Sequence, residues 1–481
     1  MFNISLSVEN LLNNQLFSRQ RRWLEKLPIS WLSLLVVAGV LLLSVVIPQR
    51  APARFLLIII GLPPAIGGLL AIIRWPGLGI MILIVAALIA PSPRLPGGFN
   101  TAVLFLMLLI GLWLLDMIAR RRQIRLVASR TVRPLLALII VAMVAFFVGQ
   151  VHWFNFANPA PIDAQLGGLA IFILAAGAFF LVAHQVRDIR WLQGMTWVLI
   201  ALGALFVAGW LVSPIGRITG RIFQLGATAN SMFWTWLVAL AFAQAFLNKK
   251  LHPGWRAILL GVVLATLYVA FFINRGWKSG YLPPMASIAT IVAFRSKRAA
   301  LLMALVAPFI VIYLSQDAIA SDQYSYGTRV DAWIIVLDMI KINPILGFGP
   351  ANYYWYTRLF PIRGYTVVFN SHNQYIDILA QTGILGLACV LWFFAEIGWL
   401  NWRLRWRVPE GFPIAYVYGA LGGLVGTIAS GMLVDWFLPF VYNIGLKGFR
   451  GGMLPWLFLG GLVSINKIFN SSENLTLQPN E

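Results

Sequence analysis

Residues 371–400 read SHNQYIDILAQTGILGLACVLWFFAEIGWL, a short polar segment followed by an apolar run over 374–400. About 20 mostly apolar residues are enough for a transmembrane helix, so this run predicts a membrane span. Similar runs lie at about 29–48, 55–73, 76–91, 99–118, 134–150, 164–184, 191–212, 229–247, 256–274, 281–294, 299–315, 374–400, 413–434 and 453–469. The run at 76–91 is short and the run at 281–294 contains two prolines, so either could be re-entrant. We therefore expect an all-α polytopic membrane protein with about 12–14 spans.

The composition excludes a string of soluble domains. Of the 481 residues, 60% are hydrophobic and 11% are charged, whereas soluble domains average about 45–50% and about 25%. The formal net charge of +21 could suggest a nucleic-acid partner, but the basic residues lie in short clusters between apolar runs, as in cytoplasmic loops. We expect no nucleic acid. The single cysteine, Cys389, excludes a disulfide framework and a cysteine-based metal site.

The loops give the expected orientation. Every second loop carries a cluster of Lys and Arg, which marks the cytoplasmic side and makes the N-terminus cytoplasmic. The expected parts are a cytoplasmic amphipathic segment over 1–28, a transmembrane bundle over 29–315, a large periplasmic or extracellular loop over 316–373, C-terminal spans over 374–469 and a disordered cytoplasmic tail over 470–481. For 1–28, a partly ordered tail is the alternative to an interfacial helix.

The loop over 316–373 is long. Loops of this length without regular secondary structure are uncommon, and those that occur are usually functional. The spacing of its apolar residues predicts an amphipathic helix over 328–342, with an apolar face made of Val330, Trp333, Ile334, Leu337 and Ile340. An aromatic cluster follows at 353–356 and includes Tyr353 and Tyr354. These side chains fit an interfacial aromatic belt; the alternative is that they stack on sugar rings.

The loop ends at Ser371-His372-Asn373-Gln374. Ser371 and Gln374 have the spacing of a capping box, which predicts that His372 lies in the first turn of a membrane helix. The amides and the dipole of a helix N-terminus attract anions and disfavour an imidazolium. We therefore expect His372 to stay neutral and to accept a proton. The plainer alternative is a polar residue at the membrane interface.

Several basic residues lie on the expected outer side, against the positive-inside bias. They are Arg217, Arg221, Arg275, Lys278 and Arg329. Because guanidinium groups bind phosphate oxygens in a bidentate way, this set predicts an anionic ligand. For any one of them, the alternative is a solvated or snorkelling side chain.

The acidic residues in or near the runs are few, namely Asp116, Asp377, Glu396 and Asp435. An ionisable group within a membrane is a functional candidate by default. None of these carboxylates has the tight spacing of a proton relay or a divalent-metal cage. We expect no metal ion and no other cofactor.

The second half of the chain contains several short motifs, namely Arg221 through Asn230, Asn274-Arg275-Gly276, Arg329-x-x-x-Trp333, Asn343-Pro344-Ile345-Leu346-Gly347-Phe348-Gly349, Ser371-His372-Asn373-Gln374-Tyr375 and Gln381-Thr382-Gly383-Ile384-Leu385-Gly386. Together they resemble the bacterial O-antigen ligase and O-antigen polymerase superfamily. Each motif alone is weak, but their order and the large outer loop among them are fairly specific to the superfamily.

This resemblance implies a GT-C-like glycosyltransferase of the bacterial cytoplasmic (inner) membrane. Such enzymes pass a glycan from a polyprenyl (undecaprenyl) diphosphate donor to an acceptor hydroxyl on the outer face, without a metal, in cell-surface polysaccharide biosynthesis. The resemblance implies that His372 is the catalytic histidine and that Arg275 and Arg329 hold the diphosphate. The expected substrate-binding residues are Arg217, Arg221, Lys278, Asn373, Tyr353 and Tyr354.

Two other classes of protein stay open. A flippase or other carrier of lipid-linked glycans would also have many helices and a basic cavity, but transporters often have halves with matching broken helices, and the sequence has no such repeat. A cell-wall polymerase of the rod-shape and division type would depend on an outward acidic residue, for which Asp331 and Asp435 are the candidates. The sequence does not distinguish a ligase from a polymerase, and the acceptor is a lipid, a protein or another glycan.

Overall fold

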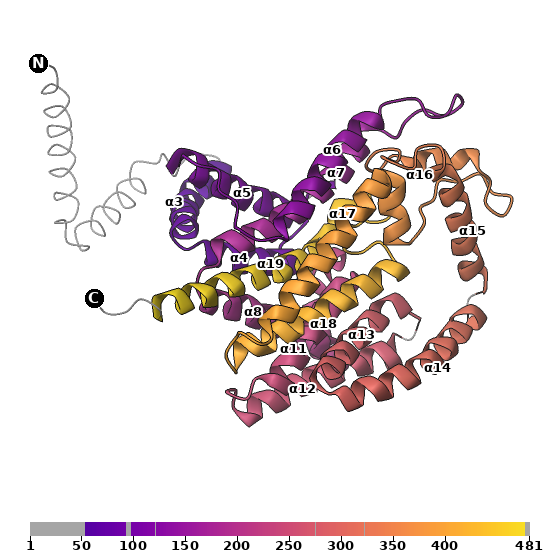
Figure 1. Ribbon diagram of the computed structural model, residues 1–481. Coiled ribbons are helices and arrows are strands. Elements are labelled where there is room, and N and C mark those ends of the chain that lie inside the picture. The colour runs from indigo at the N-terminus through magenta and orange to yellow at the C-terminus, as the bar shows by residue number, and fades with distance from the viewer. Residues whose placement is uncertain (1–52, 93–97, 121, 275, 322, 477–481) are drawn as a thin grey trace, which may run out of the picture. The chain divides into compact units, whose positions relative to one another are not determined.

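The computed structural model describes residues 53–92, 98–120, 122–274, 276–321 and 323–476 (Figure 1). The segment expected over 1–28 and the first expected span at 29–48 lie outside these residues. The chain divides into two units, residues 1–71 and residues 72–481. The described part of the first unit belongs to helix α3 (Ala53–Arg74), and all other described helices lie in the second unit.

The described residues of the second unit form helices and no strand, with two isolated bridges. The α-helices are α4 (Pro76–Ile89), α5 (Thr101–Leu115), α6 (Val132–Val148), α7 (Ile162–Gln185), α8 (Ile189–Leu211), α9 (Ser213–Ile222), α10 (Leu225–Thr228), α11 (Ser231–Leu247), α12 (Pro253–Tyr268), α13 (Lys278–Arg295), α14 (Lys297–Ser321), α15 (Gln323–Ile340), α16 (Tyr353–Tyr356), α17 (Gln374–Leu404), α18 (Phe412–Leu433) and α19 (Gly445–Thr476). Shorter helical turns follow at η2 (Asp116–Arg120), η3 (Val269–Ile273) and η4 (Thr357–Leu359). The polar stretch expected to be disordered from residue 470 is therefore helical as far as Thr476.

Seven described helices are long and apolar enough to cross a membrane, or up to eight if the bent pair Pro64–Arg74 and Pro76–Ile89 is one span. The seven are Thr101–Ala119, Ile162–Gln185, Ile189–Leu211, Pro253–Ile273, Gln374–Leu404, Phe412–Leu433 and Gly445–Asn470. Val132–Val148 and Ser231–Leu247 are apolar but shorter. The all-α polytopic membrane fold is confirmed. The larger number of spans expected from the sequence stays a prediction, because these spans lie within the described residues only.

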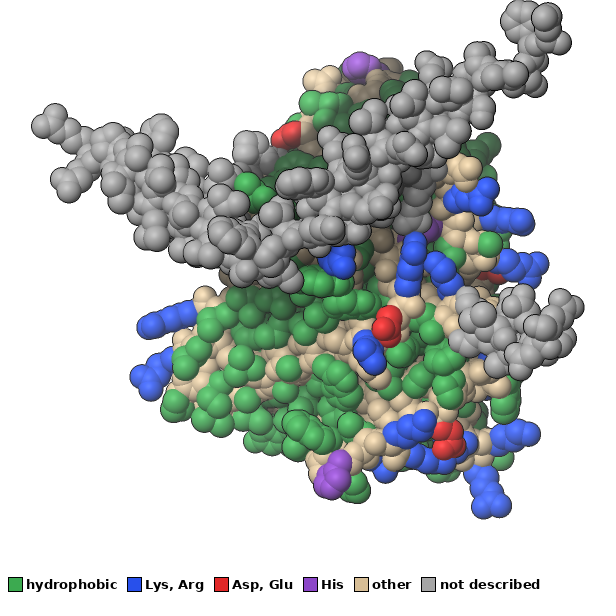
Figure 2. Space-filling model, turned by 90° about the vertical axis from the view of Figure 1, so that its left-hand side faces the viewer, with side chains coloured by type: hydrophobic (Ala, Val, Ile, Leu, Met, Phe, Trp, Pro, Cys, Tyr) green, Lys and Arg blue, Asp and Glu red, His purple; other side chains and the backbone are tan. Residues whose placement is uncertain are grey.

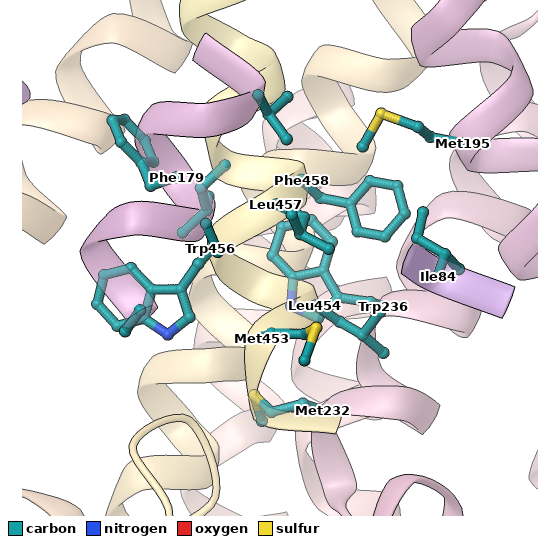
Figure 3. Close-up of a cluster of buried hydrophobic side chains, with 14 of the residues drawn as sticks. Ile84, Phe179, Met195, Met232, Trp236, Met453, Leu454, Trp456, Leu457 and Phe458 are labelled. Atoms are coloured by element: carbon teal, nitrogen blue, oxygen red, sulfur yellow. The ribbon is translucent and has the colours of Figure 1, made fainter. Parts of the chain in front are cut away.

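The core forms where α19 packs along α7. Glycine permits the close approach, since a Cβ on Gly460 would lie 2.6 Å from the carbonyl oxygen of Phe179. Next to this contact, Trp236 of α11 stacks on Phe458 of α19 with ring centroids 5.5 Å apart (Figure 3). Lipid tails are as apolar as these side chains, so close packing rather than exclusion of water holds such helices together.

Large apolar side chains also cover the outside of the helices. Phe309, Leu264 and Ile140 are more than half exposed. Figure 2 shows hydrophobic side chains over the middle of one face, with Lys and Arg mostly along its edges. This is the distribution expected when spans face lipid and loops face water.

Arg450 of α19 closes the C-terminal end of α4. Its Nε donates to the carbonyl oxygen of Ala87 at 2.8 Å, and the side chain is 1% exposed. Its terminal nitrogens donate to the carbonyl oxygens of Ala86 and Ala90 and to the hydroxyl of Ser92. The last carbonyls of a helix have no partner within that helix, so a guanidinium with five N–H donors replaces the missing amides.

Helix α17 is broken once, at Gly383, where φ is +64°. A continuous helix would have hydrogen bonds from Ile384 N to Ala380 O and from Leu385 N to Gln381 O. At this break, these four groups instead bond to the backbone of the loop over 344–349. The donors and acceptors are Ile384 N to Pro344 O (2.8 Å), Leu385 N to Ile345 O (3.4 Å), Phe348 N to Ala380 O (2.9 Å) and Gly349 N to Gln381 O (3.0 Å). The exchange joins the sequence motif at 343–349 to the motif at 381–386.

We predict that Gly383→Ala destabilises the protein. A Cβ at this position would lie 2.1 Å from the carbonyl oxygen of Ile345, and φ is positive. The backbone at Gly383, with φ of 64° and ψ of −169°, lies in a region that is essentially restricted to glycine, and such a conformation costs another residue roughly 1–3 kcal/mol. The measurement is the thermal unfolding midpoint in detergent. The matched control is Gly261→Ala within α12, where a Cβ meets nothing within 4 Å, and it should leave the midpoint unchanged or slightly raised. Equal midpoints for the two variants would contradict the prediction.

Candidate functional site

Asn373 is the N-cap of α17. Its Oδ1 accepts hydrogen bonds from Tyr375 N at 3.0 Å and Ile376 N at 3.3 Å. Its Nδ2 donates to the carbonyl oxygen of Met432 at 3.3 Å. The amide that the sequence analysis assigned to substrate binding is therefore occupied by the helix start and by α18.

The capping box expected from Ser371 and Gln374 is wrong. Ser371 Oγ accepts from Asn373 N at 3.1 Å, and the Gln374 side chain exchanges two hydrogen bonds of 3.0 Å with the backbone of Leu438. These contacts place His372 just before the helix rather than in its first turn.

His372 has a left-handed backbone, with φ of +48°, a conformation uncommon outside glycine. Its ring is partly buried, and Nδ1 lies 3.4 Å from Asn443 Nδ2. Burial and, second, the positive charge of Arg329 lower the pKa of His372 to about 4. The ring is therefore neutral at pH 7, as expected. Its low pKa is caused by burial and by Arg329, whereas the sequence analysis attributed it to the helix dipole.

Arg329 and Trp333 are four residues apart on α15, so they share a face of that helix. Trp333 Nε1 donates to the carbonyl oxygen of Ser371 at 2.7 Å. This bond holds the Arg329–Trp333 face of α15 next to Ser371, the residue before His372. Arg329, on the same face of the helix, is the second cause of the lowered pKa of His372.

The helix expected over 328–342 begins earlier, at Gln323, and ends at Ile340. Of its expected apolar face, Ile340 is buried against the rest of the chain, whereas Ile334 and Leu337 are exposed. The buried residues are Ala332, Val336, Met339 and Ile340. Packing against α17 selects this face, which the apolar spacing alone did not determine.

Hydroxyl and carboxyl groups form a buried network next to His372. The Tyr353 hydroxyl donates to Asp377 Oδ1, and Ser371 Oγ lies 2.7 Å from the same oxygen. The Tyr353 hydroxyl also accepts from Ser371 N at 3.1 Å. Burial raises the pKa of Tyr353 well above its usual value, so the hydroxyl keeps its proton. The network holds Ser371, and with it the start of the His372 backbone.

Tyr353 and Tyr354 are buried within the long loop between α15 and α17. Their exposed fractions are 0% and 6%. Both rings contact Phe440, at centroid distances of 5.1 and 5.6 Å, and Tyr354 also contacts Tyr442 at 5.4 Å. This packing leaves neither ring face open to a sugar, so it favours a supporting role over the alternative of stacking on sugar rings.

Asn443 lies beside His372 and is bonded to Asp435, and no sequence motif connects either residue with the histidine. Asn443 Nδ2 is 2.9 and 3.1 Å from the two carboxyl oxygens of Asp435, and Asp435 Oδ2 also accepts from Phe440 N at 3.0 Å. Burial, with the nearby charge of Asp377, raises the pKa of Asp435 well above its usual value. Asn443 gave no sequence signal, because only the fold brings it next to the histidine.

The other expected cations are not joined to this group by a described contact. Arg217 and Arg221 are exposed on α9, and within the described residues no hydrogen bond or ion pair connects them to His372. Lys278 is the first residue of α13, and its side chain is not described. Arg275 lies outside the described residues.

A cavity of about 440 Å³ opens beside Asn443. It lies between the first turn of α7 and the segment that leads into α19, and its polar lining side chains are Asp163, Asn443 and Lys447. The cavity provides room for a polar group close to the histidine. Over the part of the chain that the structure describes, no three His, Cys, Asp or Glu residues are grouped so that they could hold a metal ion.

Residues 235–391 match the family model described as O-antigen ligase. No curated protein matches the chain. The match confirms the resemblance to the O-antigen ligase and polymerase superfamily, and together with the apolar helices it indicates a multi-pass membrane protein of polysaccharide biosynthesis with ligase- or polymerase-type activity. The matched region contains His372 and Arg329, whereas Asp435 and Asn443 lie beyond it.

We predict that His372 titrates with a midpoint of about 4 and that Arg329→Gln raises this midpoint. A nearby cation disfavours the imidazolium, so its removal must raise the pKa. The measurement is NMR of histidine-labelled protein, with the His372 signal assigned from its loss in His372→Gln. Lys341→Gln is the control, because Lys341 is exposed and paired with Asp338. A wild-type midpoint near 6.5, or equal midpoints in Arg329→Gln and Lys341→Gln, would contradict the prediction.

Proposed function

Starting from the O-antigen ligase region at residues 235–391, we propose that this chain is a metal-independent glycosyltransferase of the bacterial cytoplasmic membrane. It transfers a glycan from a polyprenyl-diphosphate donor to an acceptor hydroxyl. The N-terminus is cytoplasmic, and the reaction takes place on the outer face. The observation that carries the proposal is a neutral histidine, His372, held beside the cation of Arg329 at the start of a membrane helix.

In the proposed reaction, His372 Nε2 takes the proton of the acceptor hydroxyl while the hydroxyl oxygen bonds to the anomeric carbon of the donor sugar. The bond from that carbon to the diphosphate oxygen breaks, and the lipid diphosphate leaves with the bonding electrons. The imidazolium then returns its proton to the leaving phosphate or to water. A positioned base of this kind contributes about 10²–10⁴-fold.

A pKa of about 4 makes His372 a weaker base than one matched to pH 7. A bound diphosphate offsets the charge of Arg329, which is one of the two causes of the low pKa. Donor binding therefore raises the basicity of His372, and the base strengthens when the donor is in place. Arg329 also stabilises the negative charge that grows on the leaving group.

The remaining expected residues have proposed roles in binding. Arg275 holds the diphosphate together with Arg329, as the resemblance implies, and Arg217, Arg221 and Lys278 attract it electrostatically. Asn373 and the two tyrosines act through the loop structure. The cavity beside Asn443 is the proposed place of the acceptor.

We predict that His372→Ala and Arg329→Ala each abolish glycan transfer, by about 10²-fold or more, because they remove the base or the charge that stabilises the leaving group. The assay uses vesicles that contain the protein, a polyprenyl-diphosphate oligosaccharide and a panel of lipid, protein and glycan acceptors. The control Lys341→Gln should retain wild-type transfer, since its exposed side chain is paired with Asp338.

The same vesicles distinguish the carrier alternative. If His372→Ala blocks transfer while the donor stays accessible on the outer leaflet, the enzyme proposal stands. If the wild type transfers to no acceptor but speeds movement of the donor across the bilayer, the protein is a carrier and the role assigned to His372 is wrong.

A further inference from the structure

A second cavity lies at the end of α18 that is opposite to His372. Its volume is about 380 Å³, and its lining residues come from the first half of α8, the loop after α11 and the start of α18. At the other end of α18, the Met432 carbonyl oxygen accepts from Asn373, the neighbour of His372. The 22 residues of α18 separate its two ends by roughly 33 Å. The distance between the two ends is thus close to the thickness of a bilayer core, which is about 30 Å.

Asn248 places a buried oxygen atom at this cavity. Its Nδ2 donates to Gln244 Oε1 at 2.8 Å, and Gln244 Nε2 donates to the carbonyl oxygen of Phe412 at 3.4 Å. A carbonyl oxygen only accepts, so this chain of bonds fixes the orientation of both amides. Asn248 is 5% exposed, and its Oδ1 accepts no hydrogen bond from any described residue. A buried acceptor without a partner is costly, so a ligand with an O–H or N–H donor fits this position.

The unbalanced charge at the cavity is positive. Lys250 is exposed and is in none of the ion pairs between described residues. Its side chain lies against Gly411, the N-cap of α18, where a Cβ would be 2.9 Å from Lys250 Cδ. No side chain caps α18, so its first amides add to the positive potential. Glu410 also lines the cavity, but it is paired with Lys249 at 3.2 Å. The complementary ligand is therefore an anion.

Apolar side chains form one wall of the cavity and continue from it along α8. Trp197 and Phe412 both line the cavity, and their ring centroids are 6.5 Å apart. Ala201 and Leu205 are exposed four and eight residues after Trp197, on the same side of the helix. Since α8 is long and apolar enough to cross a membrane, these residues form an apolar path away from the charged end. A free phosphate would leave this path unused, whereas a phospholipid would place an acyl chain along it.

We propose that this cavity binds an anionic phospholipid whose head group carries hydroxyl donors, as in phosphatidylglycerol. The phosphate lies between Lys250 and the first turn of α18, and a glycerol hydroxyl donates to Asn248 Oδ1. An acyl chain follows Trp197 and Leu205 along α8. The bound lipid joins the ends of three helices. The site is independent of the reaction proposed for His372.

The experiment is native mass spectrometry of the full-length protein, which gives the dissociation constant of the first bound lipid. The probes are phosphatidylglycerol, phosphatidylethanolamine and phosphatidylmethanol, which has the charge of phosphatidylglycerol but no hydroxyl in its head group. We expect phosphatidylglycerol to bind about fivefold or more tightly than phosphatidylmethanol, because only its hydroxyl satisfies Asn248 Oδ1. Phosphatidylethanolamine should also bind more weakly, since its ammonium cancels the charge that complements Lys250.

Three variants locate the binding. Lys250→Gln should weaken the binding of phosphatidylglycerol about fivefold, which is the usual contribution of one basic residue near anionic lipid. Lys297→Gln is the matched control, because it makes the same change of charge at an exposed lysine outside the cavity, and it should leave the affinity unchanged. Asn248→Leu should bind phosphatidylglycerol and phosphatidylmethanol equally well.

The opposite results overturn the inference. Equal affinities of the wild type for phosphatidylglycerol and phosphatidylmethanol contradict the role of Asn248, whether or not Asn248→Leu folds. Equal effects of Lys250→Gln and Lys297→Gln indicate general attraction to a basic surface and no site at the cavity. Tighter binding of phosphatidylethanolamine than of phosphatidylglycerol contradicts the anionic head group. None of these outcomes depends on glycan transfer.

Discussion

The arrangement around His372 depends on the exchange of hydrogen bonds at the break in α17. A helix in a membrane cannot leave amide and carbonyl groups unpaired, because no water is there to replace the lost partner. The loop over 344–349 supplies those partners and receives two bonds in return. A loop that shares main-chain bonds with a membrane helix stays in place, so the site is built on the helix rather than on a freely moving connection.

From this anchor, the position of His372 follows by short steps. Trp333 bonds α15 to the carbonyl group of Ser371, and Tyr353 and Asp377 bond to its amide and its hydroxyl. The histidine backbone between these supports adopts a conformation that few residues with a Cβ adopt. Such conformations persist only where the surroundings over-determine them, and they are found mostly at functional sites.

The sequence predicted the class of fold and the order of the motifs, because apolar runs and motif spacing are local properties. It also placed Arg329 and Trp333 four residues apart, which is enough to put both on one helix face. It could not choose between Ser371 and Asn373 as the helix cap, since both residue types cap helices and the choice depends on Gln374 reaching Leu438. The same limit applies to Tyr353 and Asn443, whose surroundings come from parts of the chain far away in sequence.

The contacts of α19 also set the order in which the protein can be completed. Arg450 supplies donors to the end of α4, the Leu446 carbonyl accepts from Asn100 at the start of α5, and the Gly448 carbonyl accepts from Asn230 at the start of α11. Each of these partners is synthesised hundreds of residues earlier than the last helix. During synthesis, the carbonyl groups at the end of α4 and the side chains of Asn100 and Asn230 are therefore in place before their partners in α19 have been made. A chain that ends before Gly445 lacks these partners. Its early helices would then keep polar groups without the hydrogen bonds that they have in the complete protein.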